Sequence, residues 1–426
     1  MKFLILSQYF HPEIGATQVR LSSMCAELIR VGHEVEVVTA MPHHPEGKIS
    51  KQYRNRLFAK EFQGGVRVRR VWLYAANGSG FRRVLNYLSF MLTCSIGLLQ
   101  ARKPDFVFVD SPPLFLGIPG WLASRLWKCP FIFNVADLWP DSVCDLGVMK
   151  KGILVDGAYR LERWIYEQAD YVTAVTDGVR DSLVQRKNVP PHKILFLPNG
   201  VDTRLIAPCA PDEHLKISLG LDGKRIAIYA GNHGYAAGAE QILYAAQHLS
   251  SNQQLHFLFV GDGPEKPALR KLAADLNLTN VTFLDSVELK TLPSLLSIAE
   301  LALITLRKAR VTMGARPAKA FVMMAAAKPI VLAAVGEAEN LVRASGAGIV
   351  VPPDDPRAMA NAIQTLLDDP ALAKQIGTAG RTYVERYFEW SVLVRDWLQQ
   401  LQQASTVHNT SETNYELPVT RSPAKP

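Results

Sequence analysis

Short runs of consecutive apolar residues, rich in Val, Ile and Phe, alternate with helix-length segments along most of this chain. A run that is apolar at nearly every position indicates a strand buried on both faces, which is typical of parallel sheets covered by helices. The runs fall into two series, one on each side of residue 200, so the sequence predicts an α/β protein with two doubly wound, Rossmann-like domains. The first series covers 2–10, 34–40, 66–74, 105–111, 131–137, 171–176 and 194–199, and the second covers 226–231, 256–261, 281–285, 301–306, 329–334 and 348–351.

Changes in composition mark the borders of these domains. Residues 1–200 form the first predicted domain, and a Pro-bearing stretch at 201–221 is predicted to be a linker. Residues 222–389 form the second domain, and 390–403 form an amphipathic helix that must pack on another element. Residues 404–426 are rich in Ser, Thr, Asn, Pro and Lys, and we expect a disordered tail there. The apolar stripe of the helix consists of Val392, Leu393, Trp397 and Leu401.

The overall composition excludes several classes of protein. With 426 residues, 48% of them hydrophobic and 20% charged, the chain is long and apolar enough for two or three folded domains. The five cysteines include no CxxC pair, which favours a reducing cytosol over a disulfide scaffold. No window approaches the roughly 20 apolar residues that span a bilayer, and we expect no leader before the first run. We therefore expect a cytoplasmic protein.

Positive charge is concentrated in the first domain, which carries the formal net charge of +8, while the remainder is balanced. Residues 51–83 contain nine Lys and Arg and a single acid, Glu61, and the apolar segment 84–99 follows directly. A basic patch beside such a segment favours peripheral binding to an anionic membrane surface, here the inner face of the cell membrane. A buried helix beside a solvated strand is the alternative. No nucleic-acid motif accompanies the charge, so we expect no nucleic-acid partner.

Two turns in the first series place a carboxylate at the end of a buried run and a proline shortly after it. Asp110 is followed by Ser111 and Pro112, and Asp137 is followed by Trp139 and a proline. Because ligands bind outside the carboxyl ends of parallel strands, these turns are candidates for a polar site. Structural capping of buried carboxylates is the alternative.

The turn at 10–17 contains Glu13 and Gly15 and leads into a helix. Gly15 allows the backbone to approach a ligand closely, and the free N–H groups at a helix N-terminus favour an anion. An ordinary turn is the alternative. The pair His43-His44 has no third ligand at a suitable spacing, so we do not predict a metal site there.

Two glycine-bearing turns follow buried runs in the second series. Gly231, Asn232 and Gly234 lie in one turn and Gly263 lies in the other. Both are compatible with backbone contact to a nucleotide, although neither is a GxGxxG or P-loop motif.

A further candidate begins a helix in the second domain. Arg316 and Lys319 flank Pro317 at this helix start, where the positive end of the helix dipole suits a diphosphate. A solvated basic cap is the alternative.

The order of these motifs resembles the retaining, nucleotide-sugar-dependent glycosyltransferases with the two-domain GT-B architecture. It is most similar to bacterial family-4 enzymes of O-antigen, capsule and exopolysaccharide assembly, the N-acetyl-L-fucosaminyl transferase-like group. The resemblance covers about residues 1–390. It rests on the segments 10–17, 32–35, 42–48, 111–115, 137–142, 166–170, 198–202, 229–234, 261–265, 317–319 and 346–353.

This resemblance implies transfer of a sugar from a nucleoside diphosphate donor, usually UDP-linked, with retention of configuration and without a bound metal. It implies that the second domain binds the donor and that the first binds an undecaprenyl-diphosphate-linked saccharide. It also implies two domains facing a cleft and a C-terminal helix that returns to the first domain.

We accordingly assign roles to the candidate residues. Asp137 is the predicted catalytic residue. The acceptor-side residues are Glu13, Ser111, Pro112 and Trp139, and the donor-binding residues are Gly15, Gly231, Asn232, Gly234, Gly263, Arg316 and Lys319.

The chain departs from the family pattern at one motif. The wider family has a Glu-x7-Glu pair whose second glutamate binds the ribose, and Val322 occupies that position here while Gly314 occupies the first. A non-catalytic scaffold or binding subunit of a polysaccharide assembly complex is therefore an alternative hypothesis, and a nucleotide-sugar epimerase is a third.

Overall fold

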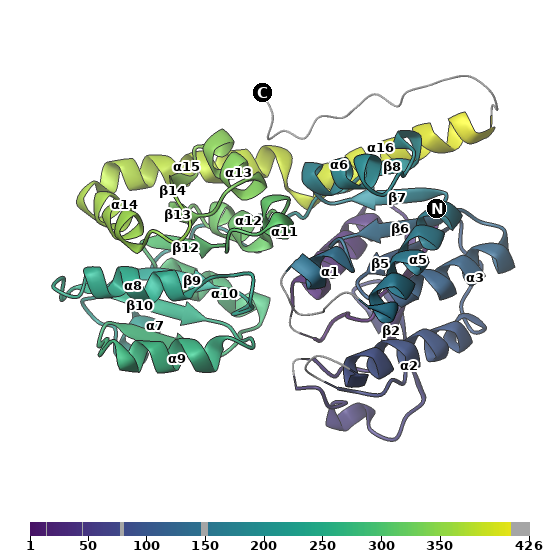
Figure 1. Cartoon of the computed structure of the whole chain (residues 1–426), viewed down its shortest axis with the longest axis horizontal. Helices are drawn as coiled ribbons and strands as arrows, with labels where there is room; N and C mark the ends of the chain where they lie inside the picture. The colour runs from purple at the N-terminus through teal and green to yellow at the C-terminus, as the bar shows by residue number, and fades with distance from the viewer. Residues whose placement is uncertain (14, 45, 77–80, 146–151, 410–426) are drawn as a thin grey trace. The chain divides into compact units, whose positions relative to one another are not determined.

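The structure is a computed structural model that describes residues 1–426 except 14, 45, 77–80, 146–151 and 410–426. The chain forms two compact units (Figure 1). Among the described residues, unit 1 comprises residues 1–198 and 393–409, and unit 2 comprises residues 199–392.

Unit 1 is built on an eight-stranded sheet with the order β3-β4-β2-β1-β5-β6-β7-β8. Its neighbouring strands are parallel except for the antiparallel pair β3 and β4. The strands are β1 (Lys2–Leu6), β2 (Glu34–Ala40), β3 (Phe58–Gln63), β4 (Val66–Val71), β5 (Phe106–Ser111), β6 (Phe131–Val135), β7 (Tyr171–Ala174) and β8 (Ile194–Phe196).

Helices connect these parallel strands. They are α1 (Ala16–Arg30), α2 (Phe81–Leu98), α3 (Gly117–Trp127), α4 (Asp141–Asp145), α5 (Ile153–Gln168) and α6 (Asp177–Gln185), with the short 3-10 turns η1 (Lys51–Tyr53), η2 (Leu114–Leu116) and η3 (Pro191–Lys193). The interior strand β6 is buried at every position, which is why its sequence is apolar apart from Asn134.

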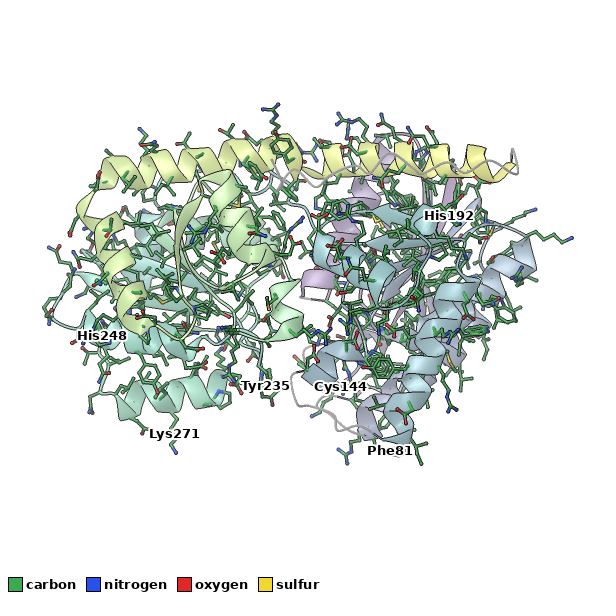
Figure 2. The ribbon with its side chains drawn as sticks, turned by 45° about the horizontal axis from the view of Figure 1, so that its top comes forward. Phe81, Cys144, His192, Tyr235, His248 and Lys271 are labelled. Carbon is green, nitrogen blue, oxygen red and sulfur yellow. The ribbon has the colours of Figure 1, made fainter. Side chains whose placement is uncertain are left out.

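Helix α2 covers part of this sheet with one face and leaves the other face to solvent. Phe90, Cys94 and Leu98 are buried against the sheet. Phe81 begins the helix and is 76% exposed (Figure 2). No helix in the described part of the chain combines the length and the hydropathy that a bilayer-spanning helix requires.

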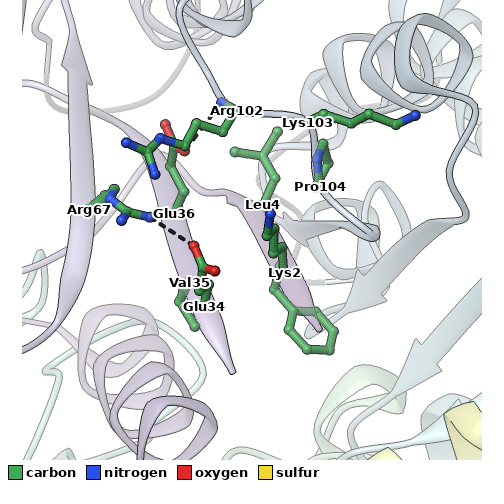
Figure 3. Close-up of a pocket in the computed structure, with 10 residues that line it drawn as sticks. Lys2, Leu4, Glu34, Val35, Glu36, Arg67, Arg102, Lys103 and Pro104 are labelled. Carbon is green, nitrogen blue, oxygen red and sulfur yellow. Dashed lines mark hydrogen bonds and ion pairs between the residues drawn. The ribbon is translucent and has the colours of Figure 1, made fainter. Parts of the chain in front are cut away.

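Ion pairs fasten the amino ends of the unit 1 strands (Figure 3). Arg67 Nη1 lies 3.1 Å from the Glu34 carboxylate, and Arg69 pairs with Glu36 in the same way. The hollow between these strands has a volume of only about 20 Å³, which is too small for a ligand.

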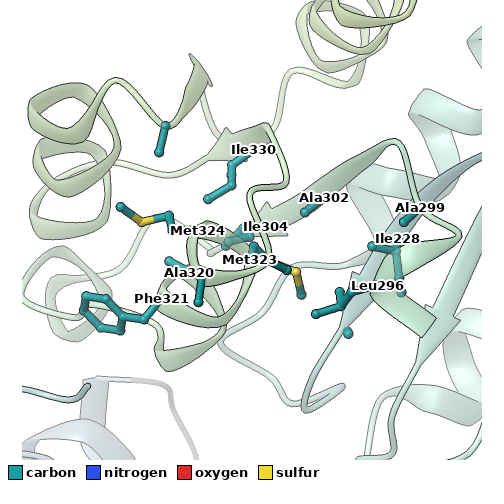
Figure 4. Packing of buried hydrophobic residues seen from close by; sticks show 14 of the residues in the cluster. Ile228, Leu296, Ala299, Ala302, Ile304, Ala320, Phe321, Met323, Met324 and Ile330 are labelled. Carbon is teal, nitrogen blue, oxygen red and sulfur yellow. The ribbon is translucent and has the colours of Figure 1, made fainter. Parts of the chain in front are cut away.

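Unit 2 contains a six-stranded, fully parallel sheet with the order β11-β10-β9-β12-β13-β14. Its apolar core includes Ile228, Ile304, Phe321 and Met323 (Figure 4). The strands are β9 (Arg225–Ala230), β10 (Leu255–Val260), β11 (Val281–Leu284), β12 (Leu301–Thr305), β13 (Ile330–Ala333) and β14 (Gly348–Val351). The helices are α7 (Glu213–Ser218), α8 (Glu240–His248), α9 (Lys266–Asp275), α10 (Leu292–Ser297) with the 3-10 turn η4 (Leu289–Thr291), α11 (Arg310–Met313), α12 (Ala318–Ala325), α13 (Glu337–Ser345), α14 (Pro356–Asp368) and α15 (Pro370–Tyr387).

The predicted fold class of two doubly wound α/β domains is confirmed. Each predicted apolar run contains a strand. Strand β3 was not predicted, because its residues alternate between half-buried and exposed and include no fully buried one.

The segment 201–221 differs from the predicted linker. Val201, Ile206 and Leu221 are buried in the core of unit 2, and helix α7 forms within the segment. These apolar residues are spaced too far apart to show a periodic pattern in the sequence.

The last described helix, α16 (Trp390–Asn409), packs on unit 1 through its apolar stripe. The Trp397 ring is fully buried and lies 5.8 Å, centroid to centroid, from the rings of both Phe3 and Phe108. Gln400 Oε1 accepts a hydrogen bond from the backbone N–H of Phe196 at 2.8 Å. The helix continues six residues past 403, where we predicted a tail, and 410–426 lie outside the described residues.

Truncating Trp397 tests this packing. We expect Trp397→Ala to destabilise unit 1 by about 3–5 kcal/mol, because it removes a large buried ring. Denaturant unfolding followed by far-UV circular dichroism measures the change. Gln399→Ala, on the exposed face of the same helix, should leave the transition within about 0.5 kcal/mol of the wild type. Equal stability of the two variants would contradict the packing of α16 on unit 1.

Candidate functional site

The carboxyl ends of the unit 1 strands carry a buried ion pair. Asp110, near the end of β5, accepts a hydrogen bond from Arg20 of α1, with 2.5 Å between Nη2 and Oδ1. The Asn134 side chain of β6 donates to the same oxygen at 2.7 Å. Burial raises the pKa of Asp110, and the neighbouring Arg20 opposes that rise. Asp110 therefore ties α1 to two strands, in agreement with a structural role for this carboxylate.

Glu13 holds the loop that follows β2. Its Oε1 accepts hydrogen bonds from the backbone N–H groups of His43 and His44, at 2.9 and 3.0 Å. The His43 ring is buried and its Nδ1 lies 3.1 Å from the same oxygen. The Glu13 carboxylate is also buried, so its observed contacts are with this loop, and its predicted acceptor-side role stays a prediction.

Half-buried aromatic rings line this edge of the sheet. Tyr87 of α2 lies 6.4 Å from Phe115, which follows β5, and Phe115 lies 6.3 Å from Trp139, which follows β6. Arg83 of α2 donates to two phenol oxygens, through Nε to Tyr87 at 2.8 Å and through Nη2 to Tyr9 at 2.7 Å. Trp139 was predicted from the sequence, whereas Arg83 and the two tyrosines were not.

The remaining unit 1 candidates lie at the same edge. Asp137 follows β6, and burial raises the pKa of its carboxyl while the Ser142 hydroxyl opposes that rise. Ser111 ends β5 and is buried, and Pro112 next to it is half-buried.

Gly15 precedes α1 at this edge, and a Cβ added there would meet no atom within 4 Å. Neither packing nor a left-handed backbone requires this glycine, since its φ of 169° is extended.

In unit 2, the two glycine turns predicted to bind the nucleotide contact each other. The turns comprise residues 231–234 after β9 and 261–265 after β10. The His233 N–H donates to the Asp262 carbonyl at 2.9 Å, and the Glu265 N–H donates to the His233 carbonyl at 3.0 Å. A Cβ on Gly263, whose φ is +155°, would lie 2.5 Å from the His233 carbonyl oxygen. This position therefore requires glycine for the two turns to meet.

Lys319 at the start of α12 lies over the first of these turns. Its ammonium donates to the Tyr229 hydroxyl at 2.8 Å and lies 4.0 Å from the centre of that ring. A Cβ added to Gly231 would be 3.4 Å from the same nitrogen. Among the described residues no carboxylate contacts Lys319, and burial lowers its pKa to about 7. Lys319 is thus a cation without an internal counter-ion beside two glycine turns.

Two other unit 2 candidates have different surroundings. Arg316, predicted to contact the donor, is buried and pairs with Glu337 of α13 at 2.8 Å. The observed contact of Arg316 is therefore an internal ion pair, and its predicted donor-binding role stays a prediction. Val322 of α12 is partly buried and packs against the unit 2 core, and the predicted loss of a ribose-binding glutamate at this position stays a prediction.

Asn232 and Gly234 lie together in the first glycine turn. The Asn232 carbonyl oxygen accepts a hydrogen bond from the Tyr229 hydroxyl at 2.9 Å, and a Cβ on Gly234 would lie 3.1 Å from the Asn232 amide nitrogen. Tyr229 therefore links this turn to Lys319, whose ammonium contacts the same hydroxyl. Within the described ranges, no three His, Cys, Asp or Glu side chains gather as metal ligands do. Independence from metal stays a prediction.

Comparison with known proteins identifies the class of enzyme. The family model described as "Glycosyl transferase 4-like domain" matches residues 15–200, and "Glycosyl transferases group 1" matches residues 212–383. Together these matches cover most of both units. The chain is a family-4-like glycosyltransferase with the GT-B fold.

Individual relatives agree with this assignment. The putative colanic acid biosynthesis glycosyl transferase WcaI of Escherichia coli is 26% identical over 413 residues, which cover 94% of this chain and all of WcaI. Sucrose-phosphate synthase of Thermosynechococcus elongatus superposes with a TM-score of 0.73 at 19% identity, over 96% of this chain and all of that one. Anabaena HepE in complex with UDP-glucose gives 0.70 at 18% identity with the same coverage, and these two likenesses concern the fold.

The contact between the glycine turns yields a test on this glycosyltransferase. We expect Gly263→Ala to lower transfer at least tenfold and to reduce stability, because the new methyl group would force the turns apart. Initial rates and thermal unfolding measure the two effects. Gly157→Ala is the matched control, since a Cβ on this exposed helical glycine meets no atom within 4 Å and should leave the rate unchanged. Full activity of Gly263→Ala would contradict a site at these turns.

Proposed function

We propose that this glycosyltransferase moves a sugar from a UDP-sugar to a lipid-linked saccharide, with retention of configuration, in the synthesis of a cell-surface polysaccharide. The donor binds unit 2 and the acceptor binds unit 1. Lys319 carries the proposal, because an uncompensated ammonium beside two glycine turns suits a diphosphate. The UDP-glucose bound to HepE supports the class of donor, and the printed role of WcaI in colanic acid biosynthesis supports the class of product.

Lys319 would act on the leaving group. When the bond between the sugar and the diphosphate breaks, negative charge grows on the departing phosphate oxygens. A cation and backbone N–H groups already in place at those oxygens stabilise the transition state more than the ground state. The backbone of the turn at 231–234, including Gly231, Asn232 and Gly234, is proposed to supply the N–H groups, and Gly263 keeps that turn in place. No metal is required for this stabilisation.

We propose that the acceptor saccharide binds near Asp137, and that Ser111, Pro112 and Trp139 line its binding site. The raised pKa of Asp137 favours a carboxyl that can hold a proton and exchange it with a hydroxyl group of the substrate. Gly15, which has open space beside it, is proposed to let backbone approach a donor phosphate, and Glu13 to act through the loop that it holds.

We also propose that unit 1 docks on the inner face of the cell membrane through a surface that we call the hairpin patch, formed by residues 51–62 of η1, β3 and the segment between them, with the exposed side of α2 beside it. Leu57 and Phe62 are 65% and 71% exposed there, and Lys51, Arg54, Arg56 and Lys60 are exposed around them. Antiparallel register places Phe62 opposite Arg67 and Phe58 opposite Val71, and Val71 packs beneath Gly97 of α2. The exposed apolar side of α2 therefore continues this patch on the same face of the sheet.

The hairpin patch offers fewer free positive charges to a membrane than the nine basic residues of segment 51–83 suggested. Arg67, Arg69 and Arg70 are ion-paired with Glu34, Glu36 and Glu61, and Arg70 is fully buried. Five exposed basic residues still surround exposed apolar side chains, an arrangement that suits anionic phospholipid. They are Lys51, Arg54, Arg56, Lys60 and Arg82.

The donor assignment predicts a pH dependence. Lys319 must carry its proton to bind a diphosphate, and its pKa is about 7 in the free protein. The KM for the UDP-sugar should therefore be flat below pH 7 and rise above it, by up to tenfold per pH unit. Initial rates between pH 6 and pH 9, with the UDP-sugar that supports turnover, measure this dependence.

Substitutions at Lys319 sharpen that test. Lys319→Ala should raise KM or lower kcat by about 10- to 100-fold at pH 6, since it removes a charge-assisted hydrogen bond of about 1.5–3 kcal/mol. Lys319→Arg should remove the pH dependence because arginine stays protonated. Lys271→Ala is the control, an exposed lysine on α9 that should leave the profile unchanged (Figure 2). Wild-type kinetics in Lys319→Ala would contradict the proposal that Lys319 binds the donor diphosphate.

The membrane proposal predicts selective binding to vesicles. Wild-type protein should co-sediment with phosphatidylglycerol vesicles more than with phosphatidylcholine vesicles, and less as salt rises. The double variant Leu57→Ser and Phe62→Ser should bind several-fold more weakly, whereas Ile217→Ser, at a comparably exposed apolar residue of α7, should match the wild type. No preference for anionic lipid at moderate salt would contradict the proposal.

A further inference from the structure

Arg83 is an arginine without a carboxylate partner at the carboxyl edge of the unit 1 sheet. Its hydrogen bonds go to the hydroxyl groups of Tyr9 and Tyr87, which are neutral, and its guanidinium lies 4.7 Å from the centre of the Tyr87 ring. Among the described residues no acid lies within ion-pair distance of it. A half-buried cation without a counter-ion is unfavourable, so an external anion that pairs with Arg83 would stabilise it.

The guanidinium keeps donors available for a ligand. Of its five N–H groups, one on Nε and one on Nη2 are used by the tyrosines. Nη1 has no hydrogen-bond partner in the described chain and is accessible to solvent. The two tyrosines fix the plane of the guanidinium and leave its Nη1 side for an oxyanion, which arginine binds through two parallel hydrogen bonds.

The surroundings of Arg83 are aromatic rather than acidic. Tyr9 follows β1, and the row from Tyr87 through Phe115 to Trp139 continues across the ends of β5 and β6. The His43 ring stacks on Tyr9 at 5.6 Å between centroids. A fixed cation at one end of a row of half-exposed rings suits a ligand in which a phosphate is joined to sugar rings, because ring faces pack against the apolar faces of sugars.

We propose that Arg83, held by Tyr9 and Tyr87, binds the phosphate of the acceptor that is linked to its lipid. This inference rests on the proposed lipid-linked acceptor and adds the group that recognises its phosphate. The saccharide then extends along Phe115 and Trp139 toward Asp137. Arg83 is a binding residue in this account and takes no part in bond breaking.

The direct test is binding of farnesyl diphosphate, a short prenyl diphosphate, by calorimetry. UDP is kept saturating so that a diphosphate cannot occupy the unit 2 site. We expect the wild type to bind farnesyl diphosphate and not farnesol, and Arg83→Gln to weaken binding at least tenfold. Arg160→Gln is the matched control, since Arg160 is an exposed arginine of α5 and its loss changes the net charge equally. Equal affinity of Arg83→Gln and wild type, or no binding by the wild type, would overturn the proposal.

Two further measurements test whether the variants fold and whether Arg83 recognises a prenyl phosphate or a membrane headgroup. Arg83→Lys keeps the charge but loses the planar fork, and we expect it to recover only part of the affinity while unfolding at the wild-type temperature. If Arg83→Gln weakened binding to phosphatidylglycerol vesicles and not to farnesyl diphosphate, the arginine would recognise a membrane headgroup and the proposal would be wrong. We expect the opposite pattern.

Donor turnover separates this inference from the function on which it rests. Hydrolysis of the UDP-sugar without acceptor, measured in the wild type with Arg160→Gln as the matched control, reports the donor chemistry by itself. If the wild type turns over the UDP-sugar and Arg83→Gln binds farnesyl diphosphate as tightly as the wild type does, the proposed phosphate site is wrong while the glycosyltransferase function stands. If no UDP-sugar is bound or turned over by the wild type, the proposed donor chemistry is wrong.

Discussion

Parallel pairing of buried strands is the constraint on which the rest of this structure depends. A parallel strand must be followed by a crossover, so the loops after the strands gather at the carboxyl edge of the sheet. In unit 1 this edge collects Tyr9, His43, Phe115 and Trp139 from loops that lie far apart in the sequence. In unit 2 it brings the two glycine turns into hydrogen-bonding contact. The only antiparallel pair among the described strands, β3 and β4, lies at the outer end of its sheet and contributes to the hairpin patch instead.

Each unit has at this edge a half-buried cation with no carboxylate partner among the described residues. Lys319 contacts the Tyr229 ring and hydroxyl, and Arg83 contacts the hydroxyl groups of Tyr9 and Tyr87. Elsewhere in the described chain, buried cations such as Arg20, Arg70 and Arg316 pair with acids. Tyrosine can orient a cation while leaving most of its charge unsatisfied, which is the condition for binding an external anion. A nucleotide diphosphate and an acceptor phosphate are the two anions that the proposed reaction brings to the protein.

The fold was readable from the sequence because strands buried on both faces are apolar at nearly every position, as in β6, where Asn134 is the exception. Strand β3 escaped this criterion, although the Gly64-Gly65 turn between Phe62 and Val66 is a hairpin signal that could have identified it. The glycine turns and Lys319 were found because the glycines and the helix start are local features.

Partners that lie far apart in the sequence could not be predicted. Arg20 and Asp110 are 90 residues apart, and nothing near Arg20 marks it as a partner. The ion pair of Arg316 with Glu337 was not predicted either, because Glu337 lies on another helix, 21 residues away. Arg83 was counted as one charge in a basic segment, since its tyrosine partners become apparent only when α2 packs beside the loop after β1.

The proton balance of UDP binding tests the central claim most directly. If the diphosphate lies against Lys319, whose pKa is about 7 in the free protein, binding at pH 8 must draw a proton onto this side chain. Calorimetric titrations of UDP in two buffers of different ionisation enthalpy count the protons taken up. The account predicts an uptake approaching one proton per UDP at pH 8, where the terminal phosphate of UDP is already ionised, and close to none at the same pH in Lys319→Arg. UDP binding with no proton uptake at pH 8 would contradict it, because the anion would then lie away from Lys319.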